Sequence, residues 1–380
     1  MVTMSRNNFL VVLGTLILAF FLNGAVKLQF YTDVYAWYPD GEVKKISPGD
    51  GIYFQPCIHP EGTHVVYYGN SIGLITFDAL RFEKGSNTQQ TASTVEPPRT
   101  VDMSFSYAID KPAYPEGKGP VVLIDEAHNN FHTAAGTYLP FAGLLRQDGY
   151  VVERAKEKIS LELLKSGTVY VIADAQPPFN MGDPPTFSGE EIRILNSWVK
   201  NGGSLFVITD HMPDPGAIKG LARSFGIEVS NGYVMQGPPP GRLGPMLFQK
   251  KDGSLADHEL TEGGGPYKEV RCVATFAGSA FRCEKAFQPI LILGEGFRSW
   301  MPEEYNEFPP GTPSIDVSGW YQGGVMPYGN GRIAFFAEAA MFTAQVFGNG
   351  RVKAGMNHPL GRDNARLLLN IIHWLSEDVP

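Results

Sequence analysis

Residues 120–226 alternate between short apolar runs and amphipathic stretches, and this alternation limits the fold to few alternatives. Three runs are almost entirely apolar: residues 121–125, 168–173 and 205–209. Continuous runs of this kind are typical of parallel strands that are buried on both faces. A helix-like stretch at 138–147 follows the first run, and a second begins with a capping box at Ser188 and Glu191, after the second run. A third, at 217–225, follows the last run. The alternation predicts an α/β domain with a mostly parallel sheet.

The same pattern returns near the C-terminus after a long interruption. Residues 333–337 form another apolar run, and residues 363–376 carry an apolar stripe at helical spacing. Between them and the first part lie Gly- and Pro-rich, β-like pieces at about 231–331. We therefore expect one α/β domain over residues 120–380, with a β-rich insertion at about 231–331.

The N-terminus carries an uninterrupted apolar stretch at residues 9–22. Fourteen helical residues reach only about 21 Å, which is short for a membrane core of about 30 Å. Residues 1–27 are therefore predicted to be either a cleaved signal peptide or an uncleaved membrane anchor, and a buried core helix is a third interpretation. The first two place the bulk of the chain outside the cytoplasm, with the membrane as a partner.

Residues 28–82 consist of short aromatic and β-branched runs broken by Pro and Gly, which predicts a small β module. Within it, residues 52–69 resemble one blade of TolB-type propeller proteins, with a Pro60-Glu61-Gly62 turn before a hydrophobic strand. A propeller needs several blades, so a single copy implies a small module only. Residues 83–119 are polar and Pro-rich, which predicts a linker, with one strand at 103–109.

Charge and cysteine content restrict the partners and the compartment. The chain has 31 basic and 39 acidic residues, a net charge of −8, which argues against a nucleic-acid partner. Cys272 and Cys283 lie in two apolar runs joined by a short Ala-Gly-Ser segment, which reads as a hairpin. Facing strands would bring the two sulfur atoms together in a disulfide; two unpaired thiols are the alternative.

Several motifs resemble a known superfamily. The chain reads IDEAHNNFHT from Ile124, TDHMP from Thr209 and EAAMFTAQ from Glu338. With the order of strands and helices, these motifs are similar to an uncharacterised bacterial group within the class I glutamine-amidotransferase-like superfamily. The resemblance implies a flavodoxin-like sheet that binds ligands at the carboxyl ends of its strands. The family's nucleophilic Cys is missing: the corresponding turn is Ala173–Pro177, so the resemblance argues against glutaminase chemistry.

Polar residues gather where the predicted strands end. They are Asp125, Glu126, His128, Asn129 and His132 after the run 121–125, Asp174 after 168–173, Asp210 and His211 after 205–209, and Glu338 after 333–337. In a parallel sheet these ends share one edge. Asp125, His128 and His211 are the candidate ligands of a divalent metal such as zinc or manganese. Without a metal, a His base oriented by Asp would work with Glu338 as the acid.

Each of these residues also has a purely structural interpretation. Asp125 and Asp174 are placed to cap turns, His211 to bond the backbone, and Glu338 to complement a helix dipole. The functional prediction is a hydrolase-type site with Asp125, His128, Asp210, His211 and Glu338 as catalytic candidates. Glu126, Asn129, His132 and Asp174 are ligand-binding candidates in the same crevice. The alternatives are a non-catalytic module that binds a carbohydrate or a peptide, and an envelope scaffold.

Overall fold

The computed structural model describes residues 100–177, 185–237, 245–264, 267–284, 286–347 and 352–377, together with six strands nearer the N-terminus. The chain divides into two compact units, Met1–Pro98 and Arg99–Pro380. In the first unit, two three-stranded antiparallel sheets form, in the orders β1-β2-β3 and β4-β5-β6. Their strands are β1 (Val11–Leu13), β2 (Val34–Trp37), β3 (Val43–Lys45), β4 (Tyr53–Ile58), β5 (His64–Gly69) and β6 (Gly73–Thr76).

Most of the predicted N-terminal features lie outside the described residues. These include the apolar stretch apart from β1, the Pro60-Glu61-Gly62 turn, and residues 83–99 of the predicted linker. Among the described residues, no helix has both the length and the apolar character needed to cross a membrane. The leader and the independent β module therefore stay predictions.

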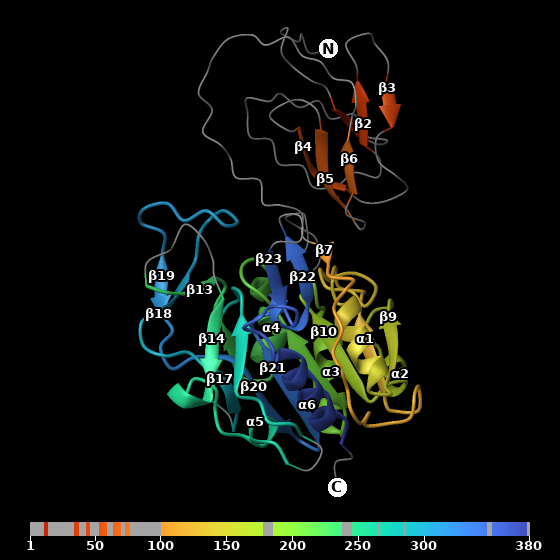
Figure 1. The fold of residues 1–380 in the computed structure, drawn as a ribbon, viewed down its shortest axis with the longest axis vertical. Helices are drawn as coiled ribbons and strands as arrows, with labels where there is room; N and C mark the ends of the chain where they lie inside the picture. Colours follow the sequence, from red (N-terminus) through yellow and green to blue (C-terminus); the bar gives the residue numbers. More distant parts are fainter. Residues whose placement is uncertain are drawn as a thin grey trace. The chain divides into compact units, whose positions relative to one another are not determined.

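The second unit is built on a nine-stranded mixed sheet (Figure 1). Five adjacent strands run parallel, in the spatial order β9-β8-β10-β11-β21. They are β8 (Val121–Asp125), β9 (Val151–Ala155), β10 (Val169–Ala173), β11 (Ser204–Ile208) and β21 (Gly331–Phe336). Antiparallel strands extend the sheet beyond β21: β20 (Tyr321–Tyr328), β16 (Phe281–Cys283), β12 (Ile227–Val229) and β17 (Gln288–Ile292). The predicted α/β class is confirmed.

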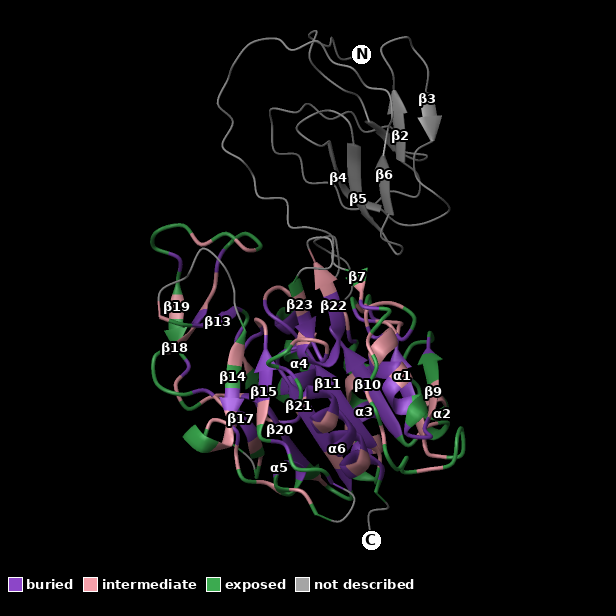
Figure 2. Cartoon of the chain, viewed as in Figure 1, coloured by how far each residue is buried: buried purple, intermediate pink, exposed green. Residues whose placement is uncertain are grey.

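Helices cover both faces of this sheet, which is why its central strands are buried on both sides (Figure 2). On one face, α1 (Leu139–Gln147) and α6 (Asn364–Ser376) pack against side chains such as Val171 and Phe206. On the other, α2 (Leu161–Lys165), α3 (Gly189–Lys200) and α4 (Asp214–Ser224) pack against Tyr170 and Val207. The capping box at Ser188 and Glu191 opens α3 as the sequence predicts.

Smaller elements complete the second unit. Three small sheets are formed by β13 (Tyr233–Gln236), β18 (Phe297–Trp300) and β19 (Ser314–Asp316); by β14 (Met246–Gln249) and β15 (Cys272–Thr275); and by β7 (Thr100–Val101), β22 (Ala344–Phe347) and β23 (Val352–Gly355). The remaining helices are α5 (Glu259–Glu262) and the 3-10 turns η1 (Lys250–Asp252) and η2 (Ala340–Phe342). The region 231–331 is β-rich as expected, but β16, β17 and β20 belong to the main sheet.

Two sequence predictions need correction. Residues 100–119 do not form a linker, because β7 pairs with β22 and Phe105 and Tyr107 pack against the main core. The predicted Cys hairpin is also wrong: Cys272 lies on β15, which pairs with β14, whereas Cys283 lies on β16, which pairs with β12. The two strands belong to different sheets, so both thiols are free.

Candidate functional site

The polar residues singled out in the sequence follow four adjacent parallel strands. Asp125 ends β8, Asp174 follows β10 directly, Asp210 comes two residues after β11, and Glu338 comes two residues after β21. Because these strands are parallel neighbours, their carboxyl ends lie at one edge of the sheet. From β8 the chain places β9 on one side and β10 on the other, which is the kind of switch point where doubly wound sheets bind ligands.

The structure sorts these residues into two separate groups. The first, which we call the His128 network, consists of Asp125, His128 and Glu191. The imidazole of His128 lies between the two carboxylates: its Nδ1 is 2.8 Å from Asp125 Oδ2, and its Nε2 is 2.9 Å from Glu191 Oε1. Carboxylates only accept hydrogen bonds, so this arrangement favours the imidazolium form of His128, in which both ring nitrogens carry a proton.

Both carboxylates of the His128 network have further hydrogen-bond partners. Asp125 accepts hydrogen bonds from the Tyr170 hydroxyl at 2.9 Å and from Asn130 Nδ2 at 3.2 Å. Glu191 Oε2 accepts from the Ser188 amide and hydroxyl at 2.9 and 2.8 Å, which completes the capping box of α3. The network therefore ties the end of β8 to the start of α3 and leaves little capacity for a ligand.

The charges in the His128 network stabilise one another. Burial acts to lower the pKa of His128, but the hydrogen bond and charge of Asp125 outweigh it, and the pKa is raised. For Glu191, burial acts to raise the pKa, but His128 and Ser188 together lower it to about 2. Glu191 is therefore ionised near neutral pH, and His128 keeps its proton to a higher pH than a free histidine does.

The second group, which we call the acidic cluster, has the opposite character. Its members are buried, and each has at most 8% of its surface exposed: His132, Asp174, Asp210, Asp214 and Glu338. One ligand atom each of His132, Asp174 and Asp210 lies within 4.8 Å of the other two. His132 Nε2 is 3.6 Å from Asp174 Oδ2. Four carboxyl groups thus share one buried region with a single imidazole.

Several oxygen atoms of the acidic cluster are unsatisfied. Asp174 Oδ1, Asp214 Oδ1 and Glu338 Oε1 are buried and have no hydrogen-bond partner among the described residues. Among the residues that the structure describes, no Lys or Arg forms an ion pair with the carboxylates of the acidic cluster. Buried polar atoms in native proteins normally have a partner, so three such oxygens in one place need an explanation.

Burial and mutual repulsion raise the pKa values of three of these carboxyl groups. The pKa of Asp174 is well above its usual value because of burial and of the charges of Asp214 and Asp210. The pKa values of Asp214 and Glu338 are raised well above normal by burial and then by Asp210. Strong perturbation by burial and by like charges marks functional sites more often than structural ones.

Backbone and ring contacts fix two members of the acidic cluster in place. Asp174 has a left-handed backbone with φ of 51°, which costs about 1 kcal/mol, and its carbonyl accepts a hydrogen bond from the Phe131 amide at 2.9 Å. His132 Nδ1 is 2.6 Å from Thr137 Oγ1, and its ring stacks on Tyr138 at 4.5 Å. These contacts turn His132 Nε2 toward Asp174.

Other predicted site residues do not join the acidic cluster. Glu126 forms an ion pair with Arg154 at 2.7 Å, and Asn129 is an exposed turn residue with φ of 54°. The ring of His211 stacks on Tyr233 at 4.3 Å, and its Nδ1 lies 2.9 Å from Met212 O.

The predicted metal set of Asp125, His128 and His211 is therefore not formed, because Asp125 and His128 already saturate each other. His211 instead contacts the backbone at Met212 O, as its structural interpretation predicts.

Two members of these groups were missed in the sequence. Glu191 was assigned only to the capping box, yet its other oxygen holds His128, 63 positions away in the chain. Asp214 opens α4 and reaches the acidic cluster, and its place four residues after Asp210 was the available signal. His132, expected only as a ligand-binding candidate, is the imidazole of the cluster.

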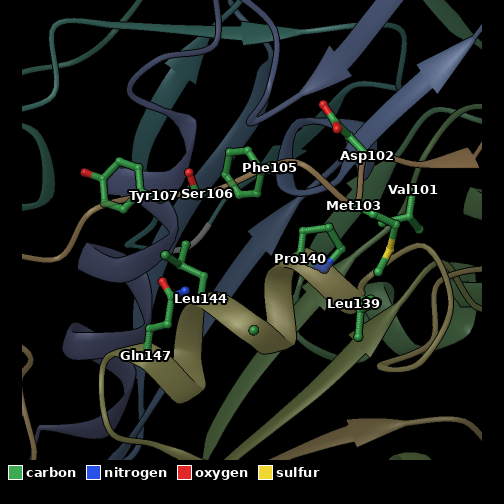
Figure 3. A pocket seen from close by; sticks show the side chains of 11 residues that line it. Val101, Asp102, Met103, Phe105, Ser106, Tyr107, Leu139, Pro140, Leu144 and Gln147 are labelled. Carbon is green, nitrogen blue, oxygen red and sulfur yellow. The ribbon is translucent and has the colours of Figure 1, made fainter. Parts of the chain in front are cut away.

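Two cavities lie apart from both groups. One of about 190 Å³ lies between residues 101–107 and α1, with Phe105, Tyr107 and Leu144 on its walls (Figure 3). The other, of about 320 Å³, is lined by Asp102, Lys353 and residues near them. Neither cavity shares a lining residue with the His128 network or the acidic cluster.

Comparisons with known proteins give the following result. No family model matches the chain, and no curated protein matches it. Among solved structures, the N-terminal domain of mmIFT52 is similar, with 14% identity and a TM-score of 0.47, over 68% of this chain and 97% of that one. A protein described as ThuA-like from Bacteroides uniformis ATCC 8492 has 14% identity and a TM-score of 0.39, over 72% and 96%. A cytoplasmic protein from Salmonella typhimurium LT2 has 12% identity and a TM-score of 0.41, over 67% and 98%. The TolB-type resemblance finds no support in them.

Proposed function

We propose that the protein is a hydrolase-type enzyme that acts at the acidic cluster of a flavodoxin-like sheet. The single observation that carries this proposal is the convergence of four buried carboxyl groups, from separate strand ends and from α4, with unsatisfied oxygens among them. The strand order β9-β8-β10-β11-β21 supports the flavodoxin-like assignment, because it corresponds to 2-1-3-4-5 along the chain.

The cluster supplies the two proton-transfer functions that hydrolysis requires. Burial and the charge of Asp210 raise the pKa of Glu338, which favours its protonated form and suits it to donate a proton to a leaving group. The carboxyls of Asp174 and Asp210 lie where an attacking water would be oriented. As the water oxygen bonds to the electrophilic atom, the Asp210 carboxylate takes a proton from that water. The bond to the leaving group breaks with its electron pair, and the leaving group takes the proton of Glu338. Asp210 is the most exposed member of the cluster, at 8%.

A substrate panel tests this proposal. Esters, phosphate esters and glycosides of p-nitrophenol are incubated with the full-length chain and with Glu338→Gln. The variant is expected to lose activity by about 100-fold or more, because it has no proton to donate. Glu303→Gln, at an exposed glutamate, is the matched control and keeps the activity. Equal activity of Glu338→Gln and the wild type on every hydrolysed substrate contradicts the proposal.

A binding function is the second candidate, and the cavity beside α1 favours it. Phe105 and Tyr107 offer aromatic faces and Gln147 offers a polar amide, a combination that suits one small polar ring such as a sugar (Figure 3). If binding is the function, Tyr107→Ala abolishes retention on a carbohydrate array, whereas Glu338→Gln leaves it unchanged. The reverse result favours the hydrolase.

We further propose that residues 1–27 carry the chain to the membrane and that its bulk lies outside the cytoplasm. The apolar stretch at 9–22 supports this location. Protease digestion of intact spheroplasts checks it. Degradation of the α/β unit is expected, and full protection contradicts the proposed location.

A further inference from the structure

We propose that the acidic cluster binds one divalent transition-metal ion, Mn²⁺ or Zn²⁺, through His132, Asp174 and Asp210. A role of this ion in activating the attacking water rests on the proposed function, whereas the binding of the ion does not. The ligand set differs from the one expected in the sequence, since it contains neither His128 nor His211.

The distances fit a common ion. Ligand atoms bound at about 2.1 Å lie about 3 Å apart when adjacent and about 4.2 Å apart when opposite. His132 Nε2 and Asp174 Oδ2 are 3.6 Å apart, between these limits. Asp210 supplies a third atom, and all three lie within 4.8 Å of one another. Small side-chain adjustments therefore suffice to place one ion among them.

The unsatisfied oxygens are an independent observation that points to a cation. Asp174 Oδ1, Asp214 Oδ1 and Glu338 Oε1 belong to side chains at least nine-tenths buried, and these three atoms have no hydrogen-bond partner among the described residues, although the Asp174 and Asp214 carboxyl groups interact with each other. A buried carboxylate is costly unless it is paired or coordinates a metal. In the His128 network, by contrast, two carboxylates share one imidazolium and need no further cation.

The contacts of His132 prepare it as a ligand. When Nδ1–H donates to Thr137 Oγ1, the Nε2 lone pair faces Asp174. Metal-binding histidines are usually oriented in this way by a second hydrogen bond, which fixes the tautomer. Stacking on the buried Tyr138 holds the plane of the ring. In this tautomer His132 is an oriented nitrogen ligand.

The donor types decide between classes of ion. Imidazole nitrogen suits Zn²⁺ and related ions, whereas carboxylate oxygens suit Mn²⁺ and Mg²⁺. Mg²⁺ and Ca²⁺ seldom take nitrogen ligands, so one imidazole with several carboxylates favours a transition-metal ion that accepts both kinds of donor. Three protein ligands leave an open position for water, whose pKa a bound ion lowers.

Calorimetry on the metal-stripped, full-length chain tests the site. Titration with MnCl₂ and with ZnCl₂ is expected to show one ion per chain for at least one of the two. Asp174→Asn and Asp210→Asn should each weaken binding by about 100-fold or more, since each removes a ligand charge. Asp110→Asn, at an exposed aspartate, is the matched control and keeps the wild-type affinity. Unchanged affinity in both ligand variants, or binding of Mg²⁺ alone, overturns the proposal.

A spectroscopic measurement keeps the test decisive if a variant does not fold. Electron spin-echo spectra of the wild-type chain with one equivalent of Mn²⁺ are expected to show one coupled imidazole nitrogen. Absence of that coupling from the bound ion excludes His132 as a ligand. An ion that binds without any hydrolysis in the substrate panel refutes only the proposed function. Hydrolysis that persists unchanged in EDTA, without ion binding, refutes only the metal site.

Discussion

The His128 network and the acidic cluster occupy the same edge of one sheet but balance their charges differently. In the network, one imidazole lies between two carboxylates, each hydrogen-bonded to it at 2.8–2.9 Å. In the cluster, one imidazole is shared among four carboxyl groups, and three buried oxygens have no partner among the described residues. Both groups are almost fully buried, so exposure does not separate them.

This difference separates a structural role from a functional one. A buried ion pair whose hydrogen bonds are all made holds two elements together, and removal of one partner leaves an uncompensated charge. A buried cluster with excess like charge stabilises nothing by itself and persists only because the surrounding fold imposes it. Such a site gains stability when a cation or a substrate group arrives, which is the behaviour expected of a binding site.

The largest expected effect comes from His128→Leu. The substitution leaves Asp125 and Glu191 buried without their shared cation, so the free energy of unfolding should fall by about 3 kcal/mol or more. Urea denaturation of the wild type and the variant measures the difference. Arg271→Leu, at an exposed ion pair with Glu269, is the control and should change stability little. A loss in His128→Leu no greater than in the control would mean that the network is not structural.

Asp174→Asn should shift stability in the opposite direction. In buffer with EDTA, the variant removes one of several repelling carboxyl groups, and asparagine tolerates the left-handed backbone at this position, so unfolding should require about 1 kcal/mol more. Addition of MnCl₂ should reverse the order, because the ion stabilises only the wild type. Thermal unfolding of both proteins, with and without the ion, shows whether the stability difference has the expected sign in each case. Destabilisation in EDTA would show that Asp174 is satisfied in the native protein.

The sequence predicts the scaffold well because local patterns determine it. The apolar runs become β8, β10 and β11, the capping box opens α3, and the strand ends carry the expected acids. Parallel strands must share an edge, so the gathering of Asp174, Asp210 and Glu338 follows from the strand assignment alone.

Local sequence patterns do not predict which of the residues at that edge contact one another. His128 selects Glu191 because α3 begins beside the end of β8, and this proximity depends on packing between distant segments. Asp214 reaches the cluster because α4 starts immediately after the Asp210 turn. Cys272 and Cys283 read as a hairpin locally, but sheet pairing with β14 and β12 separates them. Tertiary contacts decide each of these cases.

Thr137→Val should have a smaller effect that is confined to the acidic cluster. Valine preserves the shape of threonine but cannot orient His132 through Nδ1, so Mn²⁺ affinity should fall by about tenfold, or about 1.4 kcal/mol. The free energy of unfolding in EDTA should change little. Calorimetric titration beside a urea curve separates the two quantities. Wild-type affinity in the variant would show that the hydroxyl does not position the ligand.

The last prediction concerns how the stability contributed by the His128 network depends on pH. Glu191 has a pKa of about 2 in the folded chain and 4.5 as a free side chain, so its contribution is present above about pH 4.5 and is lost as the pH falls toward 2. His128 has a raised pKa, so its contribution is present below about pH 6.5 and is lost as the pH rises through the folded-state value. The stability difference between the wild type and His128→Leu should therefore be greatest between about pH 4.5 and 6.5. Urea curves at pH 3, 5.5 and 9 measure this difference, and equal values at the three pH values would show that His128 is held by its shape and not by its charge.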